Sequence, residues 1–171
     1  MAIDHDLERL LDPGYLDDLA ARDPEELRAM RAEAQRVEAK LSYIRRLVQG
    51  RLDIVSAELA RRAEGAAPDD LSTLVERLPE ILADRGRAPG PGRLPTNLVP
   101  PDDGDDLTGE LDRIGNLTSL PDLSVPELED VSERLKTLER QVSTHRRAMF
   151  GVIDSLQAEL ASRYEHGDVG A

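Results

Sequence analysis

The sequence contains no cysteine and no tryptophan, and aromatic residues make up only 2% of its 171 positions. Without thiols the chain cannot hold a disulfide scaffold, a thiolate zinc site or a cysteine nucleophile, and a reducing compartment suits it. The core of a β-sandwich or barrel usually takes much of its bulk from aromatic side chains, so those folds are disfavoured. Charged residues, by contrast, reach 33%, which is typical of long solvated helices. The sequence therefore predicts an all-α fold.

Basic residues are also fewer than acidic ones: the chain has 22 Lys and Arg and 35 Asp and Glu, and its formal net charge is −13. Such a surface repels phosphate backbones and anionic lipids, so we expect neither direct nucleic-acid binding nor membrane binding, and a basic protein partner is favoured. No apolar run reaches the length of a membrane span, and the first ten residues lack the basic and apolar regions of a signal peptide. We expect a soluble, cytoplasmic protein.

Proline and glycine are scarce in two long stretches and concentrated between them, where eight of the eleven prolines lie. This density is typical of a linker. The composition predicts five segments: short N-terminal amphipathic helices in 1–22, a first long helix in 23–65, a linker in 66–123 with a short helix near 70–84, a second long helix in 124–166, and a tail in 167–171.

Both long segments open with helix start signals. Asp23 is a favoured N-cap residue, with Pro24 at the first helical position and Glu26 three residues after the cap. Ser124 and Glu127 have the spacing of a capping box. These signals indicate where each long helix begins.

Apolar residues recur in both long segments at alternating steps of three and four, the spacing with which coiled-coil helices bury a continuous seam. Each seam has one extra four-residue step, a stutter, at the same place. Helices of about 40 residues, roughly 60 Å long, need mutual packing for stability. The sequence predicts a two-helix coiled-coil hairpin whose seam residues are Leu27, Met30, Ala34, Val37, Leu41, Ile44, Val48, Leu52, Val55 and Leu59, then Leu128, Val131, Leu135, Leu138, Val142, His145, Met149, Ile153, Leu156 and Leu160.

The two helices are also related by an internal repeat, because a shift of 101 residues aligns 38–62 with 139–163. Shared Leu, Ala, Glu and Arg mean little in coiled coils. Three other shared residue types carry more weight, since serine, glycine and aspartate are poor helix formers. These pairs are Ser42 with Ser143, Gly50 with Gly151, and Asp53 with Asp154.

The shared polar residues each follow a seam position, so they form one stripe per helix beside the seam. At 100° per residue the stripe spans an arc of about 80° and a length of about 22 Å. The first stripe is Glu38, Ser42, Arg45, Gln49 and Asp53, and the second is Glu139, Ser143, Arg146, Phe150 and Asp154.

Four neighbouring residues extend this candidate ligand-binding set. Arg46 and Arg147 add cations next to the stripes. Gly50 and Gly151 lie in the middle of the helices, where glycine costs about 1 kcal/mol relative to alanine. Because the cost is repeated, we expect a planar or bulky group to approach the backbone there.

The chemistry of the stripes suits guanine. Its Watson–Crick edge has two N–H donors for a carboxylate, and its N7 and O6 accept from an arginine fork. Packed antiparallel, the stripes would meet about a two-fold axis at the centre of the hairpin, although a linker of 58 residues could also span parallel helices. The competing interpretation is an ordinary charged coiled-coil flank.

The spacing Glu38-x3-Ser42-x2-Arg45-x3-Gln49-x3-Asp53 resembles, position for position, the cyclic di-GMP signature of the RsiG family of actinobacterial anti-sigma factors. In that family the signature is repeated on both helices of an antiparallel coiled coil, and the resemblance covers both long segments here. The second copy departs at Phe150, where the pattern has glutamine and where an aromatic ring could stack on a base instead. The resemblance implies a regulator, not an enzyme, that binds cyclic di-GMP as a dimer of ligands, without a metal. It further implies that the complex holds a WhiG-type sporulation sigma factor away from RNA polymerase.

Two other function classes are compatible with the chain's composition. An enzyme is the weakest, because the chain has three histidines and no phosphate-binding glycine loop, His-x3-His pair or serine nucleophile setting. The serious alternative is a nucleotide-independent coiled-coil adaptor or scaffolding protein. That alternative predicts that changing Arg45 or Asp53 leaves partner binding intact.

Overall fold

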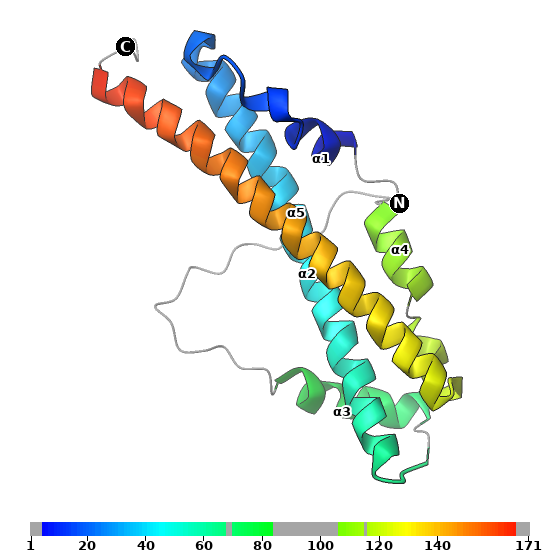
Figure 1. The fold of residues 1–171 in the computed structure, drawn as a ribbon. Coiled ribbons are helices and arrows are strands. Elements are labelled where there is room, and N and C mark those ends of the chain that lie inside the picture. The colour runs from blue at the N-terminus through cyan, green and yellow to red at the C-terminus, as the bar shows by residue number, and fades with distance from the viewer. Residues whose placement is uncertain (1–4, 68–69, 84–105, 115, 167–171) are drawn as a thin grey trace.

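The computed structural model describes residues 5–67, 70–83, 106–114 and 116–166, and every regular element within these ranges is a helix. Two long helices, α2 (Pro24–Ala63) and α5 (Val125–His166), pack against one another and run antiparallel (Figure 1). The expected all-α coiled-coil hairpin is confirmed. Much of the expected linker, 84–105, and the tail, 167–171, lie outside the described residues.

The start signals of the long helices behave as the sequence predicts. The Asp23 carboxylate accepts a hydrogen bond from the Glu26 backbone N–H at 2.7 Å, and Pro24 opens α2. At the start of α5, the Glu127 carboxylate accepts from the backbone N–H of Ser124 at 2.7 Å and from its hydroxyl at 2.6 Å. Past the end of α2, Gly65 adopts a φ of +85°, a left-handed conformation that glycine tolerates best.

The seam between α2 and α5 forms the core of the molecule. Most of the predicted seam residues are buried, and Leu27, Ala34, Ile44, Val48, Leu128, Leu135, Met149 and Leu156 are fully enclosed. Four predicted seam residues are only half-buried instead, namely Leu52, Leu59, His145 and Ile153. Ile54 and Val152, outside the expected seam, are buried.

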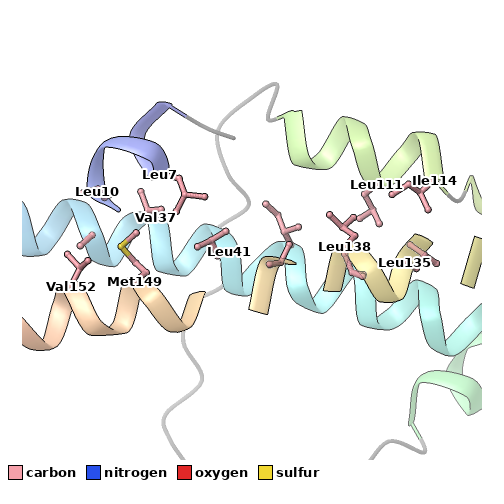
Figure 2. Packing of buried hydrophobic residues seen from close by; sticks show 14 of the residues in the cluster. Leu7, Leu10, Val37, Leu41, Leu111, Ile114, Leu135, Leu138, Met149 and Val152 are labelled. Atoms are coloured by element: carbon pink, nitrogen blue, oxygen red, sulfur yellow. The ribbon is translucent and has the colours of Figure 1, made fainter. Parts of the chain in front are cut away.

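Accessory helices explain this change of register. On α5, the short helices η1 (Pro13–Leu16) and η2 (Leu19–Ala21) pack against the long helix, and Figure 2 shows Met149 and Val152 in the same buried cluster as Leu10 of α1 (His5–Leu10). On α2, the C-terminal half packs against α3 (Leu71–Ala83), whose Leu74 joins the core. The buried face is therefore wider than a two-helix seam.

The accessory helices extend the internal repeat beyond the long helices. Before α2 come α1 (His5–Leu10), η1 (Pro13–Leu16) and η2 (Leu19–Ala21), and before α5 come α4 (Asp106–Ile114) and η3 (Leu117–Asp122). The same 101-residue offset relates Leu10 of α1 to Leu111 of α4, and both are fully buried. Figure 1 shows α1 and α4 on the same side of the hairpin. Each long helix is thus preceded by short helices that are related by the same repeat.

An equivalent arginine clamps each end of the hairpin. Arg62, near the end of α2, donates to the carbonyls of Leu120, Pro121 and Leu123 at the entry to α5. Arg163, 101 residues later, donates to the carbonyl of Leu19 at the entry to α2 at 2.8 Å. The two clamps follow the same approximate two-fold symmetry as the helices.

A buried carboxylate supports the first clamp. Glu58 is 3% exposed and accepts hydrogen bonds from Arg61 at 2.9 Å and from Arg62 at 2.6 Å. Burial raises the pKa of Glu58, but the hydrogen bonds from Arg61 and Arg62 outweigh it, so the pKa lies below its ordinary value. Folding therefore favours the ionised form of Glu58 over the protonated form.

Candidate functional site

The two polar stripes meet across the middle of the hairpin. Glu38 of α2 receives hydrogen bonds on its Oε1 atom from Ser42 Oγ, at 2.7 Å, and from Arg146 Nε of α5, at 2.9 Å. Arg146 Nε also lies 2.7 Å from Ser42 Oγ. One carboxylate and one hydroxyl of α2 thus hold an arginine of the opposite helix.

The same arrangement occurs with the helices exchanged. Glu139 Oε1 of α5 accepts from Ser143 Oγ at 2.9 Å, and Arg45 Nε of α2 lies 3.2 Å from Ser143 Oγ and 3.4 Å from Glu139 Oε1. Adding or subtracting 101 converts each contact of one set into a contact of the other. The six residues therefore form one site with approximate two-fold symmetry.

The two arginines keep donors available. Both Arg45 and Arg146 make their contacts through Nε, and their terminal amino groups have no hydrogen bond to any residue in the described part of the chain. The side chains are 32% and 29% exposed. Each guanidinium is consequently anchored at one edge and presents its two terminal nitrogens as a fork, the geometry that pairs with planar acceptors and phosphates.

The fourth position differs between the stripes. Gln49 donates from Nε2 to Glu139 Oε1 at 3.4 Å, beside Arg45. Phe150 instead lies under the guanidinium of Arg146, with Cζ 4.7 Å from the ring centroid. The glutamine-to-phenylalanine departure thus replaces an amide–carboxylate contact with a cation–π contact.

The remaining predicted residues differ in exposure. Asp53 is half-buried and Asp154 is exposed, while Arg46 and Arg147 are both exposed. The structure brings none of these four into the crossed hydrogen-bond set.

The two mid-helix glycines have different surroundings. A Cβ atom at Gly50 would lie 3.9 Å from Leu82 of α3, whereas one at Gly151 would meet nothing described within 4 Å. The distance at Gly50 is an ordinary van der Waals contact, so a Cβ atom would fit there, and the approach of a planar or bulky group stays a prediction. At Gly151 the position stays open.

The stripes face away from α1 and α4. Arg9 of α1 pairs with Glu33, and Arg51 of α2 donates to the Leu111 carbonyl of α4 at 2.5 Å and to Asp112 at 2.6 Å. At 100° per residue, Glu33 and Arg51 lie about 160° around α2 from the centre of its stripe. The face that carries the stripes is therefore not the one to which α1 and α4 dock.

The crossed pairing between Glu and Arg is a feature that the sequence alone did not reveal. The sequence does contain a pattern that indicates this pairing: Glu38 and Arg45 are seven residues apart, and Glu139 and Arg146 repeat that spacing. Residues seven apart lie on one helix face. In an antiparallel pair, each glutamate then lies opposite the arginine of the other helix.

Neither a metal-binding cluster nor a membrane-spanning helix occurs among the described residues. No cluster of three His, Asp or Glu side chains there could hold a metal ion. Within the same ranges, no helix combines the length and the apolar character needed to cross a bilayer.

The fold and the crossed stripes define the class: a helical hairpin with a symmetric set of polar side chains displayed on one face of its coiled coil. The chain matches the model of the RsiG-like family over residues 13–82 and 115–170, and it belongs to that family. The matched ranges contain both long helices and both stripes. Membership indicates a regulator of the anti-sigma-factor type, a class that regulates and does not catalyse. A search of curated proteins gives no match.

Proposed function

We propose that this protein is a cyclic di-GMP-dependent anti-sigma factor. Cyclic di-GMP, as a dimer of ligands, binds across the two stripes, and the loaded hairpin holds a WhiG-type sporulation sigma factor away from RNA polymerase. Two supports carry the proposal: membership in the RsiG-like family, and the pair of arginines whose terminal nitrogens are left without partners among the described residues.

The polar atoms of the stripes match the edges of guanine. The terminal nitrogens of Arg45 and Arg146 can donate to O6 and N7 of the base or to a phosphate. Glu38 and Glu139 use Oε1 for their internal contacts, which leaves Oε2 to accept from the N–H donors of guanine. Two ligand molecules related by a two-fold axis, each placing a guanine in one half of the site, suit a site with the same symmetry.

Charge gives a reason for the arginines to be concentrated here. On a chain of net charge −13, a dinucleotide with two phosphates meets general repulsion. Arg45, Arg46, Arg146 and Arg147 add four cations to a set with four carboxylates, so the local charge is balanced and the general repulsion is offset there. The acidic remainder of the surface suits a sigma factor, whose DNA-binding faces are basic.

The regulatory consequence is a coupling between two binding events. If the ligand forms part of the surface that grips the sigma factor, each raises the affinity of the chain for the other by the same factor. A fall in cyclic di-GMP then releases the sigma factor. No bond is made or broken in this cycle.

Calorimetric titration tests the ligand. We expect heat on adding cyclic di-GMP to the full chain with an equimolar sigma factor, and none with cyclic di-AMP, because adenine lacks O6 and the N1–H donor. Equal heats from both dinucleotides would contradict guanine recognition. No heat from either would favour the alternative of a coiled-coil adaptor that binds no nucleotide.

A further inference from the structure

The two halves of the site are chemically different, although the helices that build them are related by symmetry. The Phe half-site consists of Glu38, Ser42, Arg146 and Phe150, and the Gln half-site consists of Glu139, Ser143, Arg45 and Gln49. Resting on the proposed function, we infer that guanine occupies the Phe half-site first and more tightly, so that ligand binding proceeds in two steps and Phe150 sets their order.

The first argument concerns how firmly each arginine is held. In the Phe half-site, Arg146 Nε lies 2.9 Å from Glu38 Oε1 and 2.7 Å from Ser42 Oγ. In the Gln half-site, the corresponding distances from Arg45 Nε are 3.4 Å and 3.2 Å. A donor fork that is already ordered loses less side-chain entropy when it binds a ligand. The Phe half-site is therefore the better organised of the two.

The second argument concerns stacking. The ring of Phe150 lies 4.7 Å from Cζ of Arg146, so ring and guanidinium form a platform held from two sides. Purine bases stack on both aromatic and guanidinium planes. Gln49 offers no ring, and the Gln half-site has to recognise guanine by hydrogen bonds and by Arg45 alone.

The third argument concerns competition for the carboxylate. Glu139 Oε1 accepts from Ser143 and from Gln49, and it also pairs with Arg45. Glu38 Oε1 has only Ser42 and Arg146 as partners among the described residues. Because Gln49 further satisfies Glu139, a guanine N–H gains less by donating to that carboxylate. All three differences favour the same half-site.

The composition of the chain supplies a direct probe. Phe150 is the only phenylalanine in the sequence, so incorporation of 4-fluorophenylalanine places a single fluorine nucleus in the Phe half-site. We expect its NMR resonance to shift during the first, tighter step of a cyclic di-GMP titration of the full chain with the sigma factor. The resonance should then stay unchanged through the second step, which calorimetry of the same sample detects.

Two matched variants test the order by affinity. Phe150→Gln restores the residue found at the equivalent position in α2, and it should weaken the first step about tenfold, the size of a lost base–aromatic contact. The two steps then merge. Gln49→Ala, the control, should change the second step alone and leave the first step and the fluorine shift as they are.

The possible results distinguish a wrong order of occupation from a failure of cyclic di-GMP to bind. Heat of binding with an unmoved fluorine resonance, or a resonance that moves only in the weaker step, overturns the order of occupation and leaves cyclic di-GMP binding standing. A single step that Phe150→Gln does not alter also overturns it. Absence of both heat and shift overturns the proposed function, and the inference with it.

Discussion

Arg146 of α5 reaches across the hairpin to Glu38 of α2, with Nε 2.9 Å from Oε1. The contact has a twin of inverted direction, in which Arg45 of α2 approaches Glu139 of α5. Both arginines had to lie on the same side of the coiled coil for a shared nucleotide site to exist, and their crossed contacts show that they do.

Removing both arginines should abolish ligand binding without unfolding the hairpin. In Arg45→Ala with Arg146→Ala, we expect cyclic di-GMP affinity to fall at least about a hundredfold, since two charged donor forks are lost. Each broken ion pair is partly exposed and worth at most about 1 kcal/mol of stability. Calorimetry measures the first effect and the helical circular dichroism signal the second.

The matched control removes a cation elsewhere on α5. Arg134 is exposed and pairs with Asp130 at 3.7 Å, outside the stripes. Arg134→Ala should bind cyclic di-GMP like the unmodified chain. Wild-type affinity in the double arginine variant would show that the site lies elsewhere.

Stability should depend on pH through Glu58. Its pKa lies below the ordinary 4.5, so the ionised group stabilises the fold above that ordinary value, and this contribution is lost as the pH falls through the lowered pKa. Glu58→Gln should lower the free energy of unfolding by about 2 kcal/mol at pH 7, and the difference from wild type should shrink in acid. Urea unfolding at several pH values measures it. A difference for Glu58→Gln that stays constant down to acid pH would refute the assignment.

The end clamps should contribute unequally. Arg62→Ala removes donors to three backbone carbonyls and leaves the buried Glu58 short of a partner. Arg163→Ala removes a donor to the Leu19 carbonyl and to Glu159. We expect losses in the free energy of unfolding of about 3 kcal/mol and about 1 kcal/mol. Equal losses would show that the burial of Glu58 adds nothing to the clamp.

Replacing Gly151 by alanine should stabilise the fold and weaken binding. A Cβ at Gly151 meets nothing described within 4 Å, so Gly151→Ala should raise the free energy of unfolding by up to about 1 kcal/mol. Because the costly glycine is repeated in both helices, we expect the same variant to weaken the complex with ligand and sigma factor several-fold. Ser162→Ala, an exposed substitution on the same helix, is the control for a stability gain alone. Unchanged affinity in Gly151→Ala would mean that nothing approaches the backbone there.

Local signals predicted the main helices well. Asp23, Ser124 and the alternating three- and four-residue steps depend on neighbours within one helix, and the structure confirms the starts and most of the seam. The stripes were predicted as rows on single helices for the same reason. What these rows bind stays a prediction.

Features that depend on segments far apart in the sequence were missed. Val152 is buried although the two-helix pattern does not predict it, and the contact of Leu82 with Gly50 requires α3. The repeat of the accessory helices was hidden because few identical residues besides Leu10 with Leu111 and Leu19 with Leu120 mark it. The contacts of Arg62 and Arg163 with backbone carbonyls could not be predicted from the sequence pattern either, since any residue type supplies a carbonyl.

The coupling between nucleotide and sigma factor is the central claim, and one comparison tests it most directly. The dissociation constant of the full chain for a WhiG-type sigma factor would be measured with and without saturating cyclic di-GMP, at one salt concentration. We predict binding at least about tenfold tighter with the dinucleotide, a coupling of about 1.4 kcal/mol. The same dissociation constant under both conditions would contradict the account.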